Sequence, residues 1–250
     1  LQRRRQRQMC IRDRSLKGSV MTEVNYLESL NPLQYESVCS TEGPNLIIAG
    51  AGTGKTKVLT TRVAHIIDNN LAFPSQILCV TFTNKAAREM SERVQKLVSQ
   101  NMEKMPWMGT FHSIGAKIIR NHAEVIGLKQ SFTILDKDDQ LSLIKQIIKA
   151  ENLDQSQFSP KLIQSKIDHW KNKALNPNDI KSESLDNLVD EKSLSIYKIY
   201  QARLFEINCL DFGDLLLQCI NLFKVTDIHK RYSNNFKSVS YTHLRAHETQ

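Results

Sequence analysis

The chain has 250 residues, enough for one large domain or two small ones with a substantial core, and its formal net charge is +8. Residues 1–20 carry a net charge of +6, which leaves only +2 over the other 230 residues. The overall charge is therefore poor evidence for a nucleic-acid partner, and any DNA-binding surface must be a local patch.

The cysteines and the apolar runs limit where the protein can work. Five cysteines show no C-x-x-C pairing, which favours a reducing compartment, here the cytoplasm, over a disulfide scaffold. Cys79 lies inside an apolar run, so we expect a buried thiol. No apolar run is long enough to cross a membrane, and no apolar segment of a secretory signal follows the basic start.

The two ends of the chain differ from its middle. Both resemble translated sequencing-adaptor sequence, and neither has amphipathic periodicity. We therefore expect native protein from Met21 to near Val239, with non-native tails at 1–20 and 240–250. The alternative interpretation of the first tail is a genuine basic arm that binds phosphates.

The first expected element is a short helix. Asn31 can cap a helix whose first position is Pro32, because the fixed φ of proline suits that position. Gln34 then lies in the first turn. Its amide offers one acceptor and two donor protons, which matches an adenine edge.

A glycine-rich turn follows an apolar run that begins at Leu46 and is expected to be a strand. The turn comprises Ala49, Gly50, Ala51, Gly52, Thr53, Gly54, Lys55 and Thr56. Glycines let backbone N–H groups close around phosphate oxygens, so this order predicts a phosphate-binding P-loop. Lys55 can reach the β- and γ-phosphates and Thr56 can hold Mg²⁺, although the general pattern has Gly in place of Ala49.

The following segments alternate between helix and strand patterns. Apolar spacing predicts helices over Lys55–Ile67, Thr83–Val98 and from His112 to near Gly127. Residues 76–82 form a continuous apolar run typical of a strand covered on both faces, and 106–111 is a shorter strand candidate. This alternation predicts a doubly wound, parallel α/β sheet.

Three polar segments each follow an expected strand. They are the P-loop, Thr81–Asn84 and Gly109–Ser113. Because ligands of such sheets bind at the carboxyl ends of the strands, we expect the three segments to face one crevice.

Residues 131–206 change in character. They hold helical patterns that start near Asp136, Ser159 and Asp190, and they show no obvious buried strand. We interpret them as a helical insertion within the α/β domain. A further helix is expected after Leu210, and Phe236–Val239 resembles the start of a strand. The expected division is a lobe over 21–130, the insertion over 131–206, and a return to the lobe over 207–239.

Five motifs in order carry a family resemblance: L-N-P-x-Q, A-G-A-G-T-G-K-T, V-T-F-T-N-K-A-A-x-E-M, G-T-F-H-S and L-D-F-x-D-L-L. From Leu30 to Val239 the chain resembles the N-terminal part of superfamily-one DNA helicases of the UvrD/Rep/PcrA type. The resemblance implies a truncated, RecA-like P-loop lobe with an inserted α-helical subdomain. It also implies an ATP-dependent DNA helicase that uses ATP and Mg²⁺, moves 3′ to 5′ on single-stranded DNA, meets duplex junctions, and serves DNA repair or replication.

The resemblance also implies residue roles. Gln34 would read the adenine, the turn from Ala49 to Thr56 would hold the triphosphate and Mg²⁺, and Lys57 stands where the family commonly has a nucleotide-binding Arg. The expected contacts with the single strand are Thr81, Phe82, Thr83, Asn84, Thr110, Phe111, His112 and Ser113. Stacking of unpaired bases on Phe82 would tolerate any sequence.

Several of these residues could instead have a purely structural role. Phe82 and Phe111 could be core residues at a sheet edge, and His112 could be a capping or packing residue. Asp211 and Asp214 could suggest a metal site, but acidic residues early in a helix more often complement its N-terminus.

ATP hydrolysis also needs an acid on Mg²⁺ and a carboxylate for the attacking water. Relatives carry both in a D-E-x-x-D motif that ends the next strand, expected here at Phe236–Val239, yet no D-E pair follows it. The second motor lobe with its arginine fingers is also absent. We therefore expect this polypeptide to bind ATP weakly and not to unwind DNA. The alternatives are the motor part of a helicase–nuclease subunit and an unrelated P-loop phosphotransferase.

Overall fold

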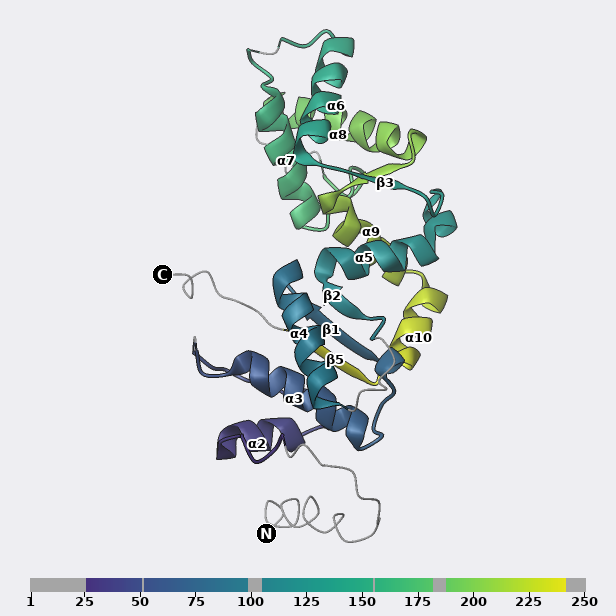
Figure 1. Cartoon of the computed structure of the whole chain (residues 1–250). Coiled ribbons are helices and arrows are strands. Elements are labelled where there is room, and N and C mark those ends of the chain that lie inside the picture. Colours follow the sequence, from purple (N-terminus) through teal and green to yellow (C-terminus); the bar gives the residue numbers. More distant parts are fainter. Residues whose placement is uncertain (1–25, 51, 99–104, 155, 182–187, 242–250) are drawn as a thin grey trace. The chain divides into compact units, whose positions relative to one another are not determined.

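The structure is a computed structural model that describes residues 26–241, apart from 51, 99–104, 155 and 182–187 (Figure 1). The chain divides into two compact units, of which one ends at Gly109 and resumes at Phe236, and the other spans Thr110–Asn235. The tail expected at 1–20, most of the tail expected at 240–250, and Ala51 lie outside the described residues.

The first unit is an α/β layer. Its elements are α2 (Pro32–Cys39), α3 (Lys55–Asp68), the 3₁₀ helix η2 (Pro74–Gln76), β1 (Ile77–Thr81), α4 (Asn84–Leu97), β2 (Met108–Thr110, ending at the boundary) and β5 (Ser238–Tyr241). The sheet order is β2-β1-β5, and β1 and β5 run parallel with Ile77 opposite Ser238. The expected α/β class with a parallel sheet is confirmed, and the strand expected at Phe236–Val239 forms two residues later.

The core of this unit lies between β1 and two helices. Val63 from α3, Cys79 from β1 and Val94 from α4 are fully buried in one apolar cluster. The expectation of a buried Cys79 thiol is confirmed, and burial raises the pKa of this thiol to about 12.

The strand expected before the P-loop does not form. Leu46 and Ile48 are 86% and 88% exposed, and their segment has no regular structure. A strand needs a neighbour for its backbone N–H and C=O groups. The described sheet, β2-β1-β5, supplies none for this apolar run, so the prediction was wrong for lack of a partner strand.

The second unit is mainly helical. Its elements are α5 (Phe111–Asn121), the 3₁₀ helix η3 (Ala123–Ile126), β3 (Thr133–Leu135), α6 (Lys137–Ala150), α7 (Pro160–Asn172), α8 (Leu188–Glu206), β4 (Cys209–Asp211), α9 (Phe212–Phe223) and α10 (Thr226–Asn235). Strand β3 pairs in parallel with β4. No buried strand was expected within 131–206; β3 is a three-residue strand whose residues are exposed or half-buried, too short to show a periodic pattern in the sequence.

The three helices expected in that stretch correspond to α6, α7 and α8 (Figure 1). They share a core in which Ile147 from α6, Ile167 from α7 and Tyr200 from α8 are fully buried. The expected domain boundaries at 131 and 206 stay a prediction. Among the described helices, none combines the length and apolar character needed to span a membrane.

Helices α5 and α9 pack closely because of a glycine. A Cβ placed on Gly115 of α5 would lie 2.8 Å from the backbone oxygen of Leu215 in α9. Real Cβ atoms do not approach backbone that closely, so the missing side chain permits this helix crossing.

We predict that Gly115→Ala destabilises the protein by about 1–3 kcal/mol, because the two helices must separate. Helix propensity alone would give the opposite sign, since alanine is favoured over glycine in a helix interior by about 1 kcal/mol. Urea unfolding followed by circular dichroism measures the change. An unchanged or higher unfolding midpoint would contradict the close packing.

Candidate functional site

Gln34 lies against the P-loop. It forms a capping box with Asn31, in which the Asn31 side chain accepts from the Gln34 backbone N–H at 2.9 Å and Gln34 Oε1 accepts from the Asn31 N–H at 3.1 Å. Gln34 Nε2 also donates to the carbonyl oxygen of Thr53 at 3.0 Å. The structure thus brings together two sequence-predicted nucleotide residues that lie on either side of the apolar run.

The P-loop glycines take up a backbone conformation that other residues avoid. Gly52 and Gly54 have φ values of +74° and +91°. Gly54 is the N-cap of α3 and provides no side-chain cap, so the first N–H groups of α3 receive no such hydrogen bond. A Cβ on Gly54 would lie 2.9 Å from Gln34 Nε2, the movable end of a side chain, so the positive φ is the stronger reason for glycine there.

The chemistry of the turn fits a triphosphate. Lys55 Nζ donates to the Ala49 carbonyl at 2.9 Å, and Thr53 Oγ1 donates to the Gly50 carbonyl at 2.7 Å. The turn therefore holds an ammonium group beside the positive end of a helix, the usual combination for binding an anion. Thr56, the second residue of α3, would carry the Mg²⁺-binding hydroxyl.

Lys57 points away from the turn's glycines. Its ammonium donates to the Ser29 carbonyl at 2.6 Å, which links α3 to the segment before α2. Its expected contact with the nucleotide stays a prediction.

The Thr81–Asn84 segment joins β1 to α4. Thr81 is buried and donates to the Thr83 carbonyl at 3.1 Å, and the Thr83 side chain accepts from the Ala86 N–H at 3.2 Å, which caps α4 at Asn84. Between them, Phe82 is 50% exposed. Its ring is only half-covered by the protein, so it can offer surface to a ligand.

The Thr110–Ser113 segment opens α5 in the second unit. Thr110 and Ser113 form a capping box, with the Ser113 N–H donating to Thr110 Oγ1 at 3.2 Å. Phe111 is partly exposed, and the His112 ring meets the Phe212 ring edge to face, with centroids 5.8 Å apart. His112 thus packs against one aromatic ring, and its expected contact with the single strand stays a prediction.

Phe212 was not singled out from the sequence, although it is 50% exposed beside His112. The sequence does contain an indication: Phe212 directly follows Asp211, which can cap a helix, and a side chain at the first position of a helix is often exposed to solvent. The P-loop and Thr81–Asn84 belong to the first unit and His112 to the second, so a crevice shared by all three segments stays a prediction.

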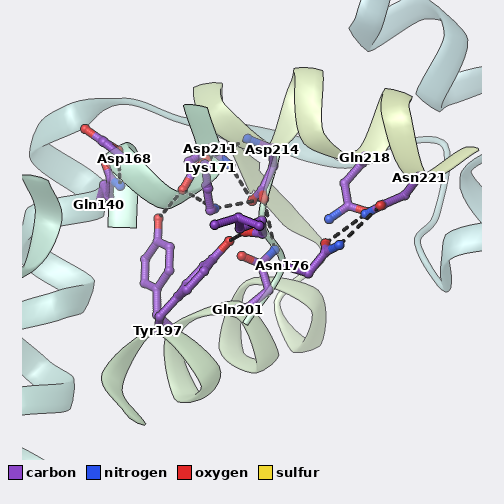
Figure 2. Close-up of polar contacts among 12 residues, drawn as sticks. Gln140, Asp168, Lys171, Asn176, Tyr197, Gln201, Asp211, Asp214, Gln218 and Asn221 are labelled. Atoms are coloured by element: carbon purple, nitrogen blue, oxygen red, sulfur yellow. Dashed lines mark hydrogen bonds and ion pairs between the residues drawn. The ribbon is translucent and has the colours of Figure 1, made fainter. Parts of the chain in front are cut away.

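A buried charge network surrounds the start of α9 (Figure 2). Lys171 Nζ, from α7, lies 2.6 Å from Asp211 Oδ2 and 2.8 Å from Asp214 Oδ1, and its side chain is 0% exposed. The Tyr200 hydroxyl donates to Asp211 Oδ2 at 2.8 Å, and Gln201 Nε2 donates to Asp214 Oδ1 at 3.1 Å. Asp211 also caps α9 through the Asp214 N–H at 2.9 Å.

Both aspartates are engaged by the helix N-terminus and by Lys171. They accept hydrogen bonds from a helix N-terminus and a lysine, as the helix-capping interpretation expected. Across the described part of the chain, no group of three or more His, Cys, Asp or Glu residues is placed to hold a metal ion.

The network holds one positive charge and two potential negative charges. Burial raises the pKa of Asp214 to about 6; the Lys171 ammonium opposes this shift, and the Asp211 carboxylate adds to it. A proton on Asp214 would make the buried cluster neutral.

We predict that Asp214→Asn stabilises the protein at pH 8 by on the order of 1–3 kcal/mol and leaves it unchanged near pH 4. The folded-state pKa of Asp214 lies above its ordinary value of 3.8, so its favourable contribution is present below that value and is lost as the pH rises through about 6. The uncharged amide does not suffer this loss. Urea unfolding at the two pH values tests this, and an equal effect at both would contradict the raised pKa.

Comparison with known proteins agrees with the motifs. The UvrD/REP helicase N-terminal domain family matches residues 30–240. The chain is 44% identical over 214 residues to the ATP-dependent DNA helicase PcrA of Staphylococcus aureus strain Mu50, a match over 85% of this chain and 29% of that protein. It is also 44% identical over 222 residues to a probable DNA helicase II homolog of Rickettsia conorii, over 88% of this chain and 34% of the relative. The chain thus spans about a third or less of the length of these relatives, and it belongs to the UvrD/REP helicase N-terminal domain family.

Proposed function

We propose that the chain is the N-terminal, ATP-binding part of an ATP-dependent DNA helicase that moves 3′ to 5′ on single-stranded DNA in the cytoplasm, in DNA repair or replication. The observation that carries the proposal is the P-loop at the start of α3, where two left-handed glycines and Lys55 adjoin helix N–H groups that no side chain caps. The family match over residues 30–240 and the helicase names of the relatives support it.

Nucleotide binding would use the backbone of the turn and the side chains of Lys55, Thr56 and Gln34. The backbone from Ala49 to Gly54 and the Lys55 ammonium would hold the phosphates, and the Thr56 hydroxyl would hold Mg²⁺. The bound Mg²⁺ would neutralise part of the negative charge of the phosphates. Both polar atoms of the Gln34 amide are engaged by Asn31 and Thr53, so adenine recognition would require Gln34 to exchange one of these partners.

DNA binding would combine exposed rings with hydroxyl and amide groups. Phe82, Phe111 and Phe212 are each at least 36% exposed and lie where helices begin. Bases of an unpaired strand would stack on such rings without sequence preference, and Thr and Ser hydroxyls and backbone N–H groups would contact phosphates. The partner is therefore single-stranded DNA, including its junctions with duplex.

Hydrolysis would need carboxylates that these 250 residues do not supply after β5, since no D-E-x-x-D motif occurs in the chain. The one Asp-Glu pair, Asp190-Glu191, lies in α8, where Asp190 pairs with Lys166. We infer that the chain by itself binds ATP weakly and does not turn it over or unwind DNA.

The single-strand function is tested with Phe82→Ala. Loss of one stacking ring should weaken binding of a labelled oligothymidine by roughly 1–3 kcal/mol, measured by fluorescence anisotropy. Phe73→Ala is the matched control, because Phe73 is 72% exposed in the same unit but lies outside every predicted DNA segment. No binding by the unmodified chain, or equal losses for both variants, would refute the DNA role.

The nucleotide function is tested with Lys55→Ala. Loss of a charged donor should weaken binding of a fluorescent ATP analogue with Mg²⁺ by about tenfold or more, while exposed Lys96→Ala leaves it unchanged. Phosphate release should be equally low for the unmodified chain and Lys55→Ala, with or without single-stranded DNA. DNA-stimulated release by the unmodified chain would contradict the inferred lack of turnover.

A further inference from the structure

Lys171 is an unusual residue within α7. Its side chain is fully buried, and its ammonium is shared by two carboxylates of a different helix. Rings of Tyr197 and Tyr200 lie 5.6 Å and 5.2 Å from Nζ. A buried ion cluster contributes little net stability compared with apolar residues of the same size, but it strongly restricts the geometry of the groups it joins. The groups joined here are α7 and the start of α9.

The cluster holds a single helical turn. Asp211 is the N-cap of α9, Phe212 and Gly213 follow, and Asp214 closes the capping box, so both aspartates bound by Lys171 flank Phe212. A Cβ on Gly213 would lie 2.9 Å from Lys171 Cδ and 3.1 Å from its Cβ, so glycine makes room for the lysine stem. Lys171 thus fills the inner side of the turn that carries Phe212.

The side chains of α8 complete the cluster. The Tyr200 hydroxyl donates to Asp211. Gln201 donates to Asp214 (Figure 2). Each carboxylate is therefore held from two helices besides its own. First turns of helices fray when their caps are lost, so these contacts restrain the backbone of the turn that carries Phe212.

We propose that Lys171 is a positioning residue for single-strand binding: by clamping the first turn of α9, it orients the exposed Phe212 ring against His112 so that a base can stack there. This inference rests on the proposed DNA function. Lys171 itself, being fully buried, touches no DNA. It acts through Asp211, Asp214 and then Phe212.

The test uses the complete chain, the labelled oligothymidine and four proteins: unmodified, Lys171→Met, Phe212→Ala and the double variant. Methionine keeps most of the stem and removes the charge. We expect Phe212→Ala to weaken binding about tenfold, Lys171→Met about fivefold, and the double variant no more than Phe212→Ala alone, because the lysine acts through the ring. If Lys171 had only a general structural role, the double variant would lose affinity by the product of the two single losses.

The matched control is Lys166→Met, on the same helix. Lys166 pairs with Asp190 away from α9, and its side chain is 28% exposed. We expect this variant to bind within twofold of the unmodified chain. A loss equal to that of Lys171→Met would overturn the proposal, as would wild-type binding by Lys171→Met. No binding by the unmodified chain would refute the DNA function itself, which is a separate result.

Lys171→Met leaves two carboxylates buried without a cation and can therefore fail to fold. In that case, Lys171→Met is combined with Asp211→Asn and Asp214→Asn, which removes all buried charge and keeps both capping oxygens. The proposal predicts that this folded triple variant still binds about fivefold more weakly, because the ion pairs between α7 and the first turn of α9 are gone. Restored wild-type affinity would overturn it.

Discussion

The backbone N–H groups at the start of each helix need partners, and this requirement organises both units. Helices α4, α5 and α9 receive caps from their own Thr83, Thr110 and Asp211 side chains. Helix α3 begins on Gly54 and receives no side-chain cap, although Lys55 lies at the same end. The nucleotide proposal rests on this uncapped end together with the left-handed glycines and Lys55, because phosphate oxygens are the acceptors that such an end binds well.

The same caps fix where exposed rings lie. Phe82 immediately precedes the cap of α4, whereas Phe111 and Phe212 follow the caps of α5 and α9. A capped first turn frays less, so the Phe111 and Phe212 rings are carried by restrained backbone and can stack on a base with little loss of conformational freedom. In α9 this restraint is reinforced by Lys171, whose charge is balanced inside the protein and is not available to phosphates.

Local patterns predicted most of the helices and β1, because apolar periodicity and caps such as Asn31-Pro32 are written into consecutive residues. Elements that depend on residues far apart in the sequence were harder to predict. The Leu46–Ile48 run has the composition of a strand but no described neighbour, and β3 is defined only by its pairing with β4. Lys171 could be predicted in part. It follows Ile167 by four residues and so lies on the buried face of α7, where a lysine requires a buried carboxylate, but the sequence does not show which carboxylate.

We propose that the nucleotide-binding and the single-strand-binding segments of this one polypeptide both serve a DNA motor. Hydrogen–deuterium exchange of the complete chain, with and without oligothymidine, tests it most directly. We expect slower exchange over Thr81–Asn84 and Thr110–Ser113, with no change over α7 residues that face solvent, such as Lys161. Slower exchange in neither segment, or equal slowing throughout the chain, would contradict it.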